Sequence, residues 1–306
     1  MSDTFDLHQQ ITDQIIRALE TTTDDFVMPW HRAAATGHPV NATSQRRYNG
    51  INAISLWVAA MNVGYATPEW ATFKQWRDTG AQVRKGEKAS LIVFYKTFTT
   101  STGKAEAVPS ADTDSPDRRF LAKPSWVFNA AQVDGYEAPI PTERPQTLFE
   151  RISTAEQVIH AANAEIRYGG ARAYYDRLTD HIQIPEVGDF IGSPTSTPQE
   201  AFYSTIFHEL AHWTGSEPRL NREKGARFGD KPYAFEELIA ELSAAMSCAE
   251  FGISCTPRLD HAHYLNSWLK VLKDDKRAIF TAAAAASAAT SFIKAFSHSE
   301  LNNLAA

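Results

Sequence analysis

The chain has 306 residues and a net charge of −6, with 43% hydrophobic and 22% charged residues, which predicts a soluble protein of two globular domains. Its two cysteines, Cys248 and Cys255, are too few for a disulfide framework, and the N-terminus has no secretory signal, so we expect reduced thiols and a cytoplasmic protein. The most apolar stretch near the C-terminus, residues 282–289, is too short to span a bilayer, so we expect no membrane partner.

The first half of the sequence predicts helices followed by two paired strands. Apolar residues recur at helical spacing, and we expect helices at residues 7–20, 52–61 and 70–79. Residues 82–100 are rich in β-branched and aromatic side chains and predict a strand, which residues 124–133 can pair with as a second strand. The polar residues between them, 101–123, predict a mobile hairpin loop.

A proline-rich stretch divides the chain. Three prolines between residues 138 and 145 predict a stiff linker, so we place one domain at residues 1–137, the linker at 138–146 and a second domain at 147–306. In the second domain we expect helices at residues 147–164, 198–215, 234–251, 261–274 and 278–296, and a hairpin of strands at 166–175 and 181–185. The chain as a whole is predicted to be an α+β protein.

The predicted helix 198–215 contains the sequence His208-Glu209-Leu210-Ala211-His212. The spacing of four residues places His208 and His212 on one helix face about one turn apart, so both can bind a single metal ion. Glu209, beside the first histidine, can take a proton from a water that the ion polarises. This pattern indicates a zinc-hydrolase site.

A third metal ligand is expected from the predicted helix 234–251. Glu237 and Glu241 lie four residues apart on one face of it, and two buried carboxylates would repel each other without a cation or a histidine N–H. We therefore assign Glu237 to the metal and Glu241 to a hydrogen bond that orients a ligand histidine. The alternative is a solvated acidic helix face. Glu236 points about 100° away from Glu237 and is expected to be exposed.

Three protein ligands leave a fourth position for water, as a catalytic zinc site requires. We expect Glu209 to act as general base and then general acid in the attack of water on a carbonyl. The ligand set predicts Zn²⁺ and also accepts Mn²⁺ or another divalent ion. Candidates for stabilising the oxyanion are Tyr233, His261, His263 and Tyr264. Residues 171–175 are hypothesised to offer a strand edge to an extended peptide.

Basic residues are concentrated near the N-terminus. Residues 30–104 contain ten Lys or Arg and three acids, a net charge of +7, which leaves −13 for the rest of the chain. Interleaved aromatic residues make this the composition that single-stranded nucleic acid requires, since cations follow phosphates and rings stack on bases. Most of these aromatic residues could instead belong to the core. The candidate contacts are Trp30, Arg46, Arg47, Tyr48, Asn52, Lys74, Arg84, Lys85 and Lys88.

Several stretches of the sequence match a known family. With them, the chain resembles the ArdC-type antirestriction proteins of conjugative plasmids over nearly its whole length. The matching stretches are residues 28–30, 46–52, 70–75, 80–88, 127–133, 207–215 and 236–241. The resemblance implies an N-terminal α+β domain that binds single-stranded DNA and a C-terminal, mostly helical, zincin-like metallopeptidase domain with a small sheet. It also implies protection of incoming plasmid DNA from host restriction during conjugation, with His208, His212 and Glu237 as metal ligands.

Two functions compete at this point. The first is a metal-dependent peptidase recruited to single-stranded DNA. The second is a DNA-binding protection protein whose metal site is structural or idle. Glu209 favours the first, because a structural site needs no general base and is normally closed by four ligands. A nuclease is disfavoured, since no cluster of acids in the sequence suits a two-metal site.

Overall fold

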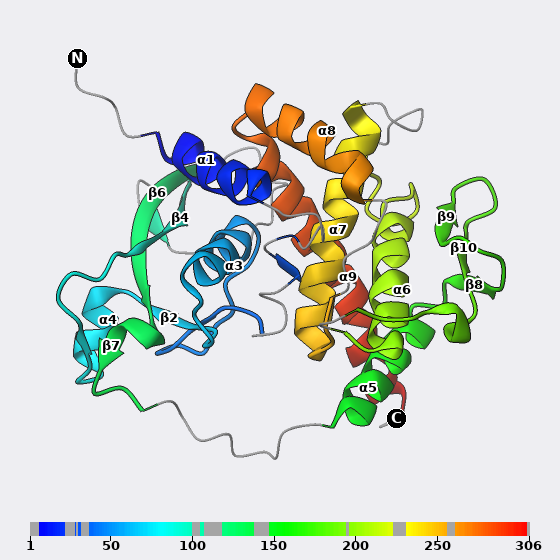
Figure 1. Cartoon of the computed structure of the whole chain (residues 1–306), viewed down its shortest axis with the longest axis horizontal. Coiled ribbons are helices and arrows are strands. Elements are labelled where there is room, and N and C mark those ends of the chain that lie inside the picture. Colours follow the sequence, from blue (N-terminus) through cyan, green and yellow to red (C-terminus); the bar gives the residue numbers. More distant parts are fainter. Residues whose placement is uncertain are drawn as a thin grey trace.

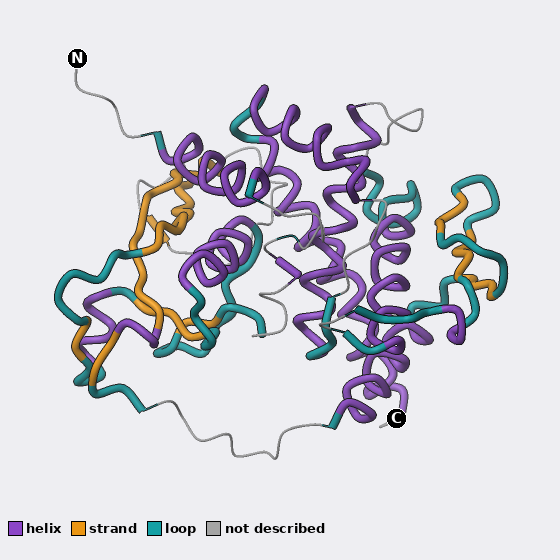
Figure 2. The backbone as a smooth tube through the Cα atoms, viewed as in Figure 1, coloured by secondary structure: helices purple, strands orange, loops and turns teal. Residues whose placement is uncertain are grey.

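A computed structural model of the chain describes residues 6–21, 28, 30–31, 37–99, 105–106, 118–137, 147–193, 196–222, 231–255 and 261–304. A twisted sheet lies at one side of the molecule and a group of long helices at the other, with a small second sheet beyond them (Figure 1; Figure 2). This mixed architecture confirms the predicted α+β class. The linker predicted at 138–146 lies outside the described residues.

The N-terminal sheet is built on one long antiparallel pair, β4 (Ser90–Thr99) and β6 (Arg118–Asn129). The sheet order is β1-β2-β6-β4-β5, and the added strands are β1 (Val40–Asn41), β2 (Glu69–Ala71) and β5 (Ala105–Glu106). The predicted pairing is confirmed, but the loop expected at 101–123 is too long, since Thr99 still pairs with Arg118. Backbone pairing does not require apolar side chains, so the strands continue past the core.

Two predicted elements of this region are divided in the structure. The expected strand 82–100 is broken by a turn, and its first residues form β3 (Gln82–Val83), which pairs with β7 (Val133–Asp134) in a separate two-stranded sheet. A 3₁₀ turn, η1 (Ala130–Gln132), lies between β6 and β7. The expected helix 70–79 begins only at α4 (Phe73–Asp78), because Thr72 caps it in a capping box with Gln75.

Helix α3 (Ile51–Val63) lies between the sheet and the C-terminal helices (Figure 1). Most of its residues are buried, and it also covers an edge of β4. Asn52 donates from Nδ2 to the carbonyl of Val93 at 2.8 Å and accepts from the Val93 N–H at 2.7 Å. Ser55 donates to the carbonyl of Leu91 at 3.0 Å. These bonds give hydrogen-bond partners to backbone groups at an edge of β4 that no described strand pairs.

The C-terminal region is a helical layer with a small sheet. Its elements are α5 (Leu148–Ala161), α6 (Pro198–Thr214), α7 (Lys231–Phe251), α8 (His261–Asp274), α9 (Ala278–Leu304), the 3₁₀ turn η2 (Val187–Asp189), and the strands β8 (Glu165–Tyr168), β9 (Tyr174–Asp176) and β10 (His181–Ile184). The strand expected at 166–175 is two strands, because Gly169 and Gly170 adopt positive φ of 110° and 73° and turn the chain. β8 then runs parallel to β10, and β9 antiparallel to it.

One apolar core joins the two regions. Helix α1 (Leu7–Glu20) packs on α3 and α8, and Ile11, Ile54 and Ile279 belong to a single buried cluster. Thr12 adds a hydrogen bond of 2.7 Å to the carbonyl of Lys276. The N-terminal and C-terminal regions are therefore held together over a wide apolar contact.

Within α9, the segment Ala278–Phe296 is long and apolar enough to cross a membrane by length and composition alone. One of its faces is occupied by protein. The buried residues recur at helical spacing along it, namely Ile279, Ala282, Ala283, Ala286, Ala289 and Ile293, and the helix packs on α5, α6 and α7. Small alanines allow this close approach of helices, so packing accounts for its composition.

Candidate metal centre and nucleic-acid interface

Helix α6 presents the two histidines of the motif toward α7. Thr197 begins the helix in a capping box with Glu200, and Pro198 occupies its first turn, where a missing N–H costs nothing. The rings of His208 and His212 lie on one face with centroids 5.0 Å apart. His208 is 2% exposed and Glu209 3% exposed. The motif is therefore buried at the contact between two helices.

Helix α7 brings Glu237 against both rings. Its Oε2 lies 3.5 Å from Nε2 of His208, and its Oε1 lies 3.4 Å from Nε2 of His212. One ligand atom from each of these three residues lies within 4.8 Å of the others. A tetrahedral ion with bonds of about 2.0–2.2 Å separates its ligand atoms by roughly 3.3–3.5 Å. The three side chains, called the metal centre below, therefore fit a small divalent ion.

The charges of the metal centre are mutually dependent. Burial opposes the charged form of His212, but the carboxylate of Glu237 outweighs it and raises the pKa of His212 to about 10. Burial opposes the charged form of Glu237 as well and by itself would raise its pKa. The two histidines nevertheless hold that pKa well below its usual range. The buried carboxylate thus requires positive charge beside it, which the histidines or a divalent ion can supply.

The other ring nitrogen of each histidine faces a second carboxylate. Nδ1 of His208 lies 3.7 Å from Oε2 of Glu241, the residue expected to orient a ligand. Nδ1 of His212 lies 3.5 Å from Oε1 of Glu236. The exposure expected for Glu236 is wrong, because this residue is only 2% exposed. Helix α7 is enclosed by its neighbours, so a rotation of 100° from Glu237 still points into protein.

Arg222 compensates the buried charge of Glu236. Its guanidinium donates to both carboxylate oxygens, at 2.6 and 3.2 Å, and to the carbonyl of Ala211 at 2.6 Å. A Cβ atom at Gly215 would lie 2.7 Å from Nη2 of Arg222, so a larger residue here would displace the guanidinium. Sequence reasoning missed Arg222, because it follows the helix in a segment without a periodic pattern.

Two of the four oxyanion candidates have described side chains. Tyr233 is half-buried beside Glu237, and burial together with the charge of Glu237 raises its pKa. Tyr264 is 6% exposed, and its ring centroid lies 6.0 Å from that of Tyr233. The side chains of His261 and His263 lie outside the described residues. Strand β9, proposed as a peptide edge, is an outer strand of its sheet and packs on α6.

Comparison with known proteins divides the chain into the same two regions. A family model described as a zincin-like metallopeptidase matches residues 153–285, and one described as the N-terminal domain of the anti-restriction factor ArdC matches residues 5–128. The crystal structure of the antirestriction protein ArdC from plasmid R388, in its metal-free form, is 34% identical with a TM-score of 0.74, covering 96% of this chain and 99% of that one. The chain belongs to the ArdC family of antirestriction proteins. The Mn(II)-bound structure of the same ArdC is also similar, with a TM-score of 0.71 and 32% identity, covering 96% of this chain and 99% of that one.

Two further relatives extend the ArdC comparison. An uncharacterized protein, y4eC, from Sinorhizobium fredii is 43% identical over 282 residues, which is 92% of this chain and 89% of that protein. A DNA primase TraC from Escherichia coli is 36% identical over 305 residues, which is 96% of this chain but only 27% of that protein. This ArdC-family chain thus corresponds to about a quarter of the longer primase.

Two of the residues expected to contact DNA in this ArdC-family chain are structural instead. Trp30 is 0% exposed and donates from Nε1 to Oε1 of Glu241 at 3.2 Å, so its ring cannot stack on a base. The side-chain Nδ2 and Oδ1 of Asn52 are both hydrogen-bonded to the backbone of Val93. A count of aromatic and amide residues could not distinguish these buried side chains from surface ones.

Two residues of the stretch 46–52, Arg47 and Gly50, connect the two regions of the ArdC fold. Arg47 forms an ion pair with Glu250 of α7. The N–H of Gly50 donates to Oγ of Ser287 in α9 at 2.8 Å, and Gly50 has a φ of 56°. Tyr48 is half-buried, and its hydroxyl accepts from Asn41 at 3.0 Å. Arg46 is exposed. Several residues of this family motif therefore make contacts that stabilise the fold.

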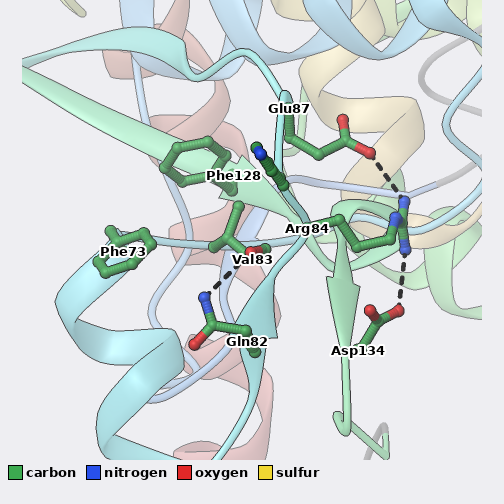
Figure 3. Close-up of a pocket in the computed structure, with 8 residues that line it drawn as sticks. Phe73, Gln82, Val83, Arg84, Glu87, Phe128 and Asp134 are labelled. Atoms are coloured by element: carbon green, nitrogen blue, oxygen red, sulfur yellow. Dashed lines mark hydrogen bonds and ion pairs between the residues drawn. The ribbon is translucent and has the colours of Figure 1, made fainter.

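Two of the remaining candidates, Arg84 and Lys85, line a pocket in the N-terminal region (Figure 3). The pocket has a volume of about 510 Å³ and is lined by Phe73, Gln82, Val83, Arg84, Lys85, Glu87, Phe128 and Asp134. Arg84 donates to Glu87 at 3.0 Å and pairs with Asp134 at 3.5 Å, so its charge is largely compensated. Lys74, Lys85 and Lys88 are exposed.

An aromatic pair at this pocket was not singled out from the sequence. Phe73 is 48% exposed and meets Phe128 edge-on, with ring centroids 6.3 Å apart. Exposed phenylalanine beside lysines is the combination that single-stranded nucleic acid contacts with base and phosphate. We call Phe73, Lys74, Lys85, Lys88 and Phe128 the aromatic-basic surface. The sequence contains no signal that selects these residues from the buried aromatics around them.

Proposed function

We propose that this ArdC-family chain binds single-stranded DNA and cleaves a protein substrate at a divalent metal, and that it thereby protects incoming plasmid DNA from host restriction during conjugation. The observation that carries the proposal is the metal centre, where three ligand atoms are correctly spaced for one ion with Glu209 beside them. The mixed ligand set of two histidines and one carboxylate suits Zn²⁺, and Mn²⁺ is the second candidate.

The roles of the side chains follow from their places. His208, His212 and Glu237 would hold the ion, which supplies Lewis-acid polarisation of a water and of a substrate carbonyl. Glu209 lies close enough to His212 for its charge to raise the pKa of that residue. It would take the proton of the attacking water and pass it to the leaving amine. Tyr233, beside Glu237, is the nearest described candidate for the oxyanion.

A hydrolytic role is preferred over a structural metal site. Within the described residues, the group that can share one ion consists of the three residues of the metal centre. Three protein ligands leave a position open to water, whereas structural zinc sites are closed by four. Glu209, buried beside His208, is in the position that proton transfer to and from a metal-bound water requires.

Binding of DNA is assigned to the aromatic-basic surface. Phe73, Phe128 and Lys85 line one pocket, and the exposed Lys74 and Lys88 adjoin lining residues in sequence. Helix α4 and strand β7, which contribute to this pocket, lie away from the C-terminal helices (Figure 1). Stacking of one base on an aromatic ring contributes about 1–3 kcal/mol. The two cysteines are buried and free, which supports our placement of the protein in the reducing cytoplasm.

The test compares Glu209→Gln with Glu200→Gln, a buried glutamate of the same helix remote from the motif. Each protein is loaded with Zn²⁺ or Mn²⁺ and incubated with a pool of unfolded proteins, and new N-termini are read by mass spectrometry. We expect cleavage by the wild type and by Glu200→Gln, and a loss of at least 100-fold in Glu209→Gln with metal binding retained. Absence of cleavage by the metal-loaded wild type would contradict the peptidase assignment.

The same two variants test the biological role. Plasmid transfer into a restricting host is measured with each variant supplied on the incoming DNA. We expect protection to fail with Glu209→Gln and to persist with Glu200→Gln. Full protection by a Glu209→Gln protein that still binds metal would favour the non-proteolytic DNA-binding protein instead.

A further inference from the structure

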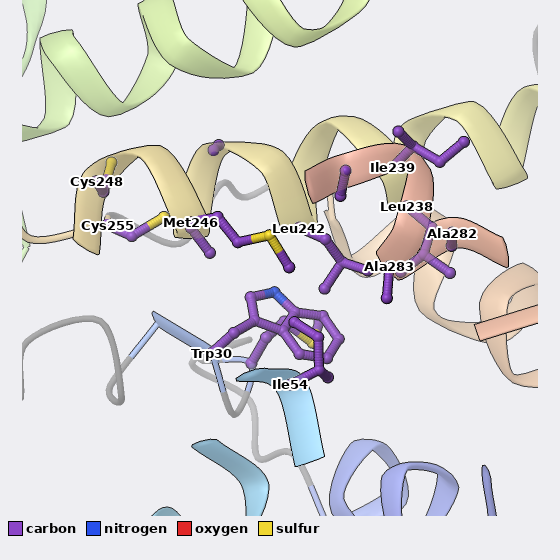
Figure 4. Packing of buried hydrophobic residues seen from close by; sticks show 14 of the residues in the cluster. Trp30, Ile54, Leu238, Ile239, Leu242, Met246, Cys248, Cys255, Ala282 and Ala283 are labelled. Carbon is purple, nitrogen blue, oxygen red and sulfur yellow. The ribbon is translucent and has the colours of Figure 1, made fainter. Parts of the chain in front are cut away.

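Two residues of the N-terminal region reach the back of the metal centre. Trp30 and His31 lie outside the C-terminal helices in sequence, yet both contact Glu241 of α7. Figure 4 shows the indole of Trp30 directed at α7, near Leu242, with Ile54 of α3 beside it. Trp30 is 0% and His31 4% exposed. The contact is thus buried between the two regions.

The backbone fixes which nitrogen of His31 carries the proton. The N–H of Met28 donates to Nδ1 of His31 at 3.1 Å, so Nδ1 must be the acceptor. The ring proton of the neutral imidazole therefore lies on Nε2, which donates to Oε1 of Glu241. The backbone N–H of Met28 thus makes Nε2 of His31 the donor to the carboxylate of Glu241.

Glu241 is held by one oxygen and faces the metal centre with the other. Its Oε1 accepts from both Nε2 of His31 and Nε1 of Trp30. Its Oε2 lies 3.7 Å from Nδ1 of His208. Two donors on one oxygen restrict the rotation of the carboxylate, and its other oxygen is thereby directed toward Nδ1 of His208.

We propose that Trp30 and His31 are positioning residues for the metal centre, which act through Glu241 on the ligand His208. The N-terminal region would then complete the metal centre as well as bind DNA. This inference rests on the proposed metal binding by His208, His212 and Glu237. It differs from a merely structural role, because it requires loss of metal affinity and altered ligand geometry rather than loss of stability alone.

The variants separate hydrogen bonding from packing. His31→Phe retains a ring and removes the donor to Glu241, whereas His31→Gln retains an N–H that can reach it. Trp30→Phe removes the indole N–H and retains an aromatic ring. The control is Trp57→Phe, which removes a comparable buried indole bond, that of Trp57 Nε1 to the Gly37 carbonyl at 3.2 Å, from α3. Glu241→Gln completes a double-mutant cycle with His31→Phe.

The experiment measures the dissociation constant for Zn²⁺ by chelator competition and the visible spectrum of the Co²⁺-substituted protein, with the full chain. We expect about tenfold weaker binding and a changed Co²⁺ spectrum in His31→Phe and Trp30→Phe, with recovery in His31→Gln. The losses of His31→Phe and Glu241→Gln should not add, because both act on one carboxylate.

Failure of the proposed function and failure of the positioning role give different results. If the wild type binds no divalent ion, the proposed function fails and the positioning role fails with it. If the wild type binds Zn²⁺ and both His31→Phe and Trp30→Phe match Trp57→Phe in affinity and spectrum, the positioning role alone is overturned. Should His31→Phe not fold, Trp30→Phe and His31→Gln still decide between these outcomes.

Discussion

Oε1 of Glu236 lies 3.5 Å from Nδ1 of His212, and the same carboxylate accepts a bidentate pair of hydrogen bonds from Arg222. Each histidine of the metal centre therefore faces its own carboxylate, Glu241 for His208 and Glu236 for His212. Such partners fix the ring orientation and raise the basicity of a metal ligand. Glu236 is 2% exposed, so this arrangement is shielded from competing water.

We predict that Glu236→Gln weakens metal binding by about 10- to 100-fold, because an amide supports His212 less well than a carboxylate. The variant retains side-chain volume and a hydrogen-bond acceptor for Arg222, so the fold should persist. Dissociation constants for Zn²⁺ from chelator competition check the prediction, with Glu200→Gln as the control. Equal affinities of Glu236→Gln and the wild type would show that Glu236 does not support the ligand.

Helical periodicity predicted most of the helices, and the spacing of four residues predicted that His208 and His212 share one face of α6 and that Glu237 and Glu241 share one face of α7. It failed for Glu236, since the prediction assumed that α7 has one solvent face. In the structure nearly every residue from 238 to 249 is buried, so direction around the helix carries no information about exposure. Arg222 reaches Glu236 from a non-helical segment, a tertiary contact without a local signal.

The N-terminal region was harder to predict for a related reason. The stretch 46–52 combines arginines, an aromatic residue and amides, which also suits a nucleic-acid loop. The structure uses them for contacts between elements far apart in sequence, such as Arg47 with Glu250 and Asn52 with Val93. Only the burial of each side chain distinguishes the two uses, and burial depends on the whole fold.

For the aromatic-basic surface, we predict that Phe73→Ala weakens binding of a single-stranded oligonucleotide by about tenfold, through loss of stacking. Lys85→Ala should instead reduce the slope of log affinity against log salt by about 0.7, since one phosphate contact is lost. Fluorescence anisotropy over a range of salt concentrations measures both. Lys270→Ala, an exposed lysine of α8, is the control. Binding that is unaffected by both Phe73→Ala and Lys85→Ala would place the DNA elsewhere.

His38 makes the fold sensitive to acid. Burial lowers the pKa of His38 from its ordinary 6.5 to about 4. Its Nε2 donates to the carbonyl of Tyr48 at 2.6 Å, while Nδ1 is buried without a hydrogen-bond partner. Protonation of Nδ1 would thus create a buried donor with no acceptor. The neutral form stabilises the fold above pH 6.5, and this contribution is lost as the pH falls toward 4.

We therefore predict that the free energy of unfolding of the wild type falls by about 3 kcal/mol more than that of His38→Gln between pH 6.5 and 4. Glutamine can retain the donor to Tyr48 and does not titrate in this range. Urea denaturation at several pH values measures the difference, with the exposed His160→Gln as the control. Parallel curves for the wild type and His38→Gln would show that His38 does not cause the acid sensitivity.

The central claim, that His208, His212 and Glu237 together hold one divalent ion, is tested most directly by anomalous diffraction from crystals grown with Zn²⁺ or Mn²⁺. We predict one strong anomalous peak at about 2.0–2.2 Å from Nε2 of both histidines and from an oxygen of Glu237. We also predict that the peak is lost in His208→Ala crystals. A peak at other residues, or none between these three side chains at saturating metal, would contradict the assignment.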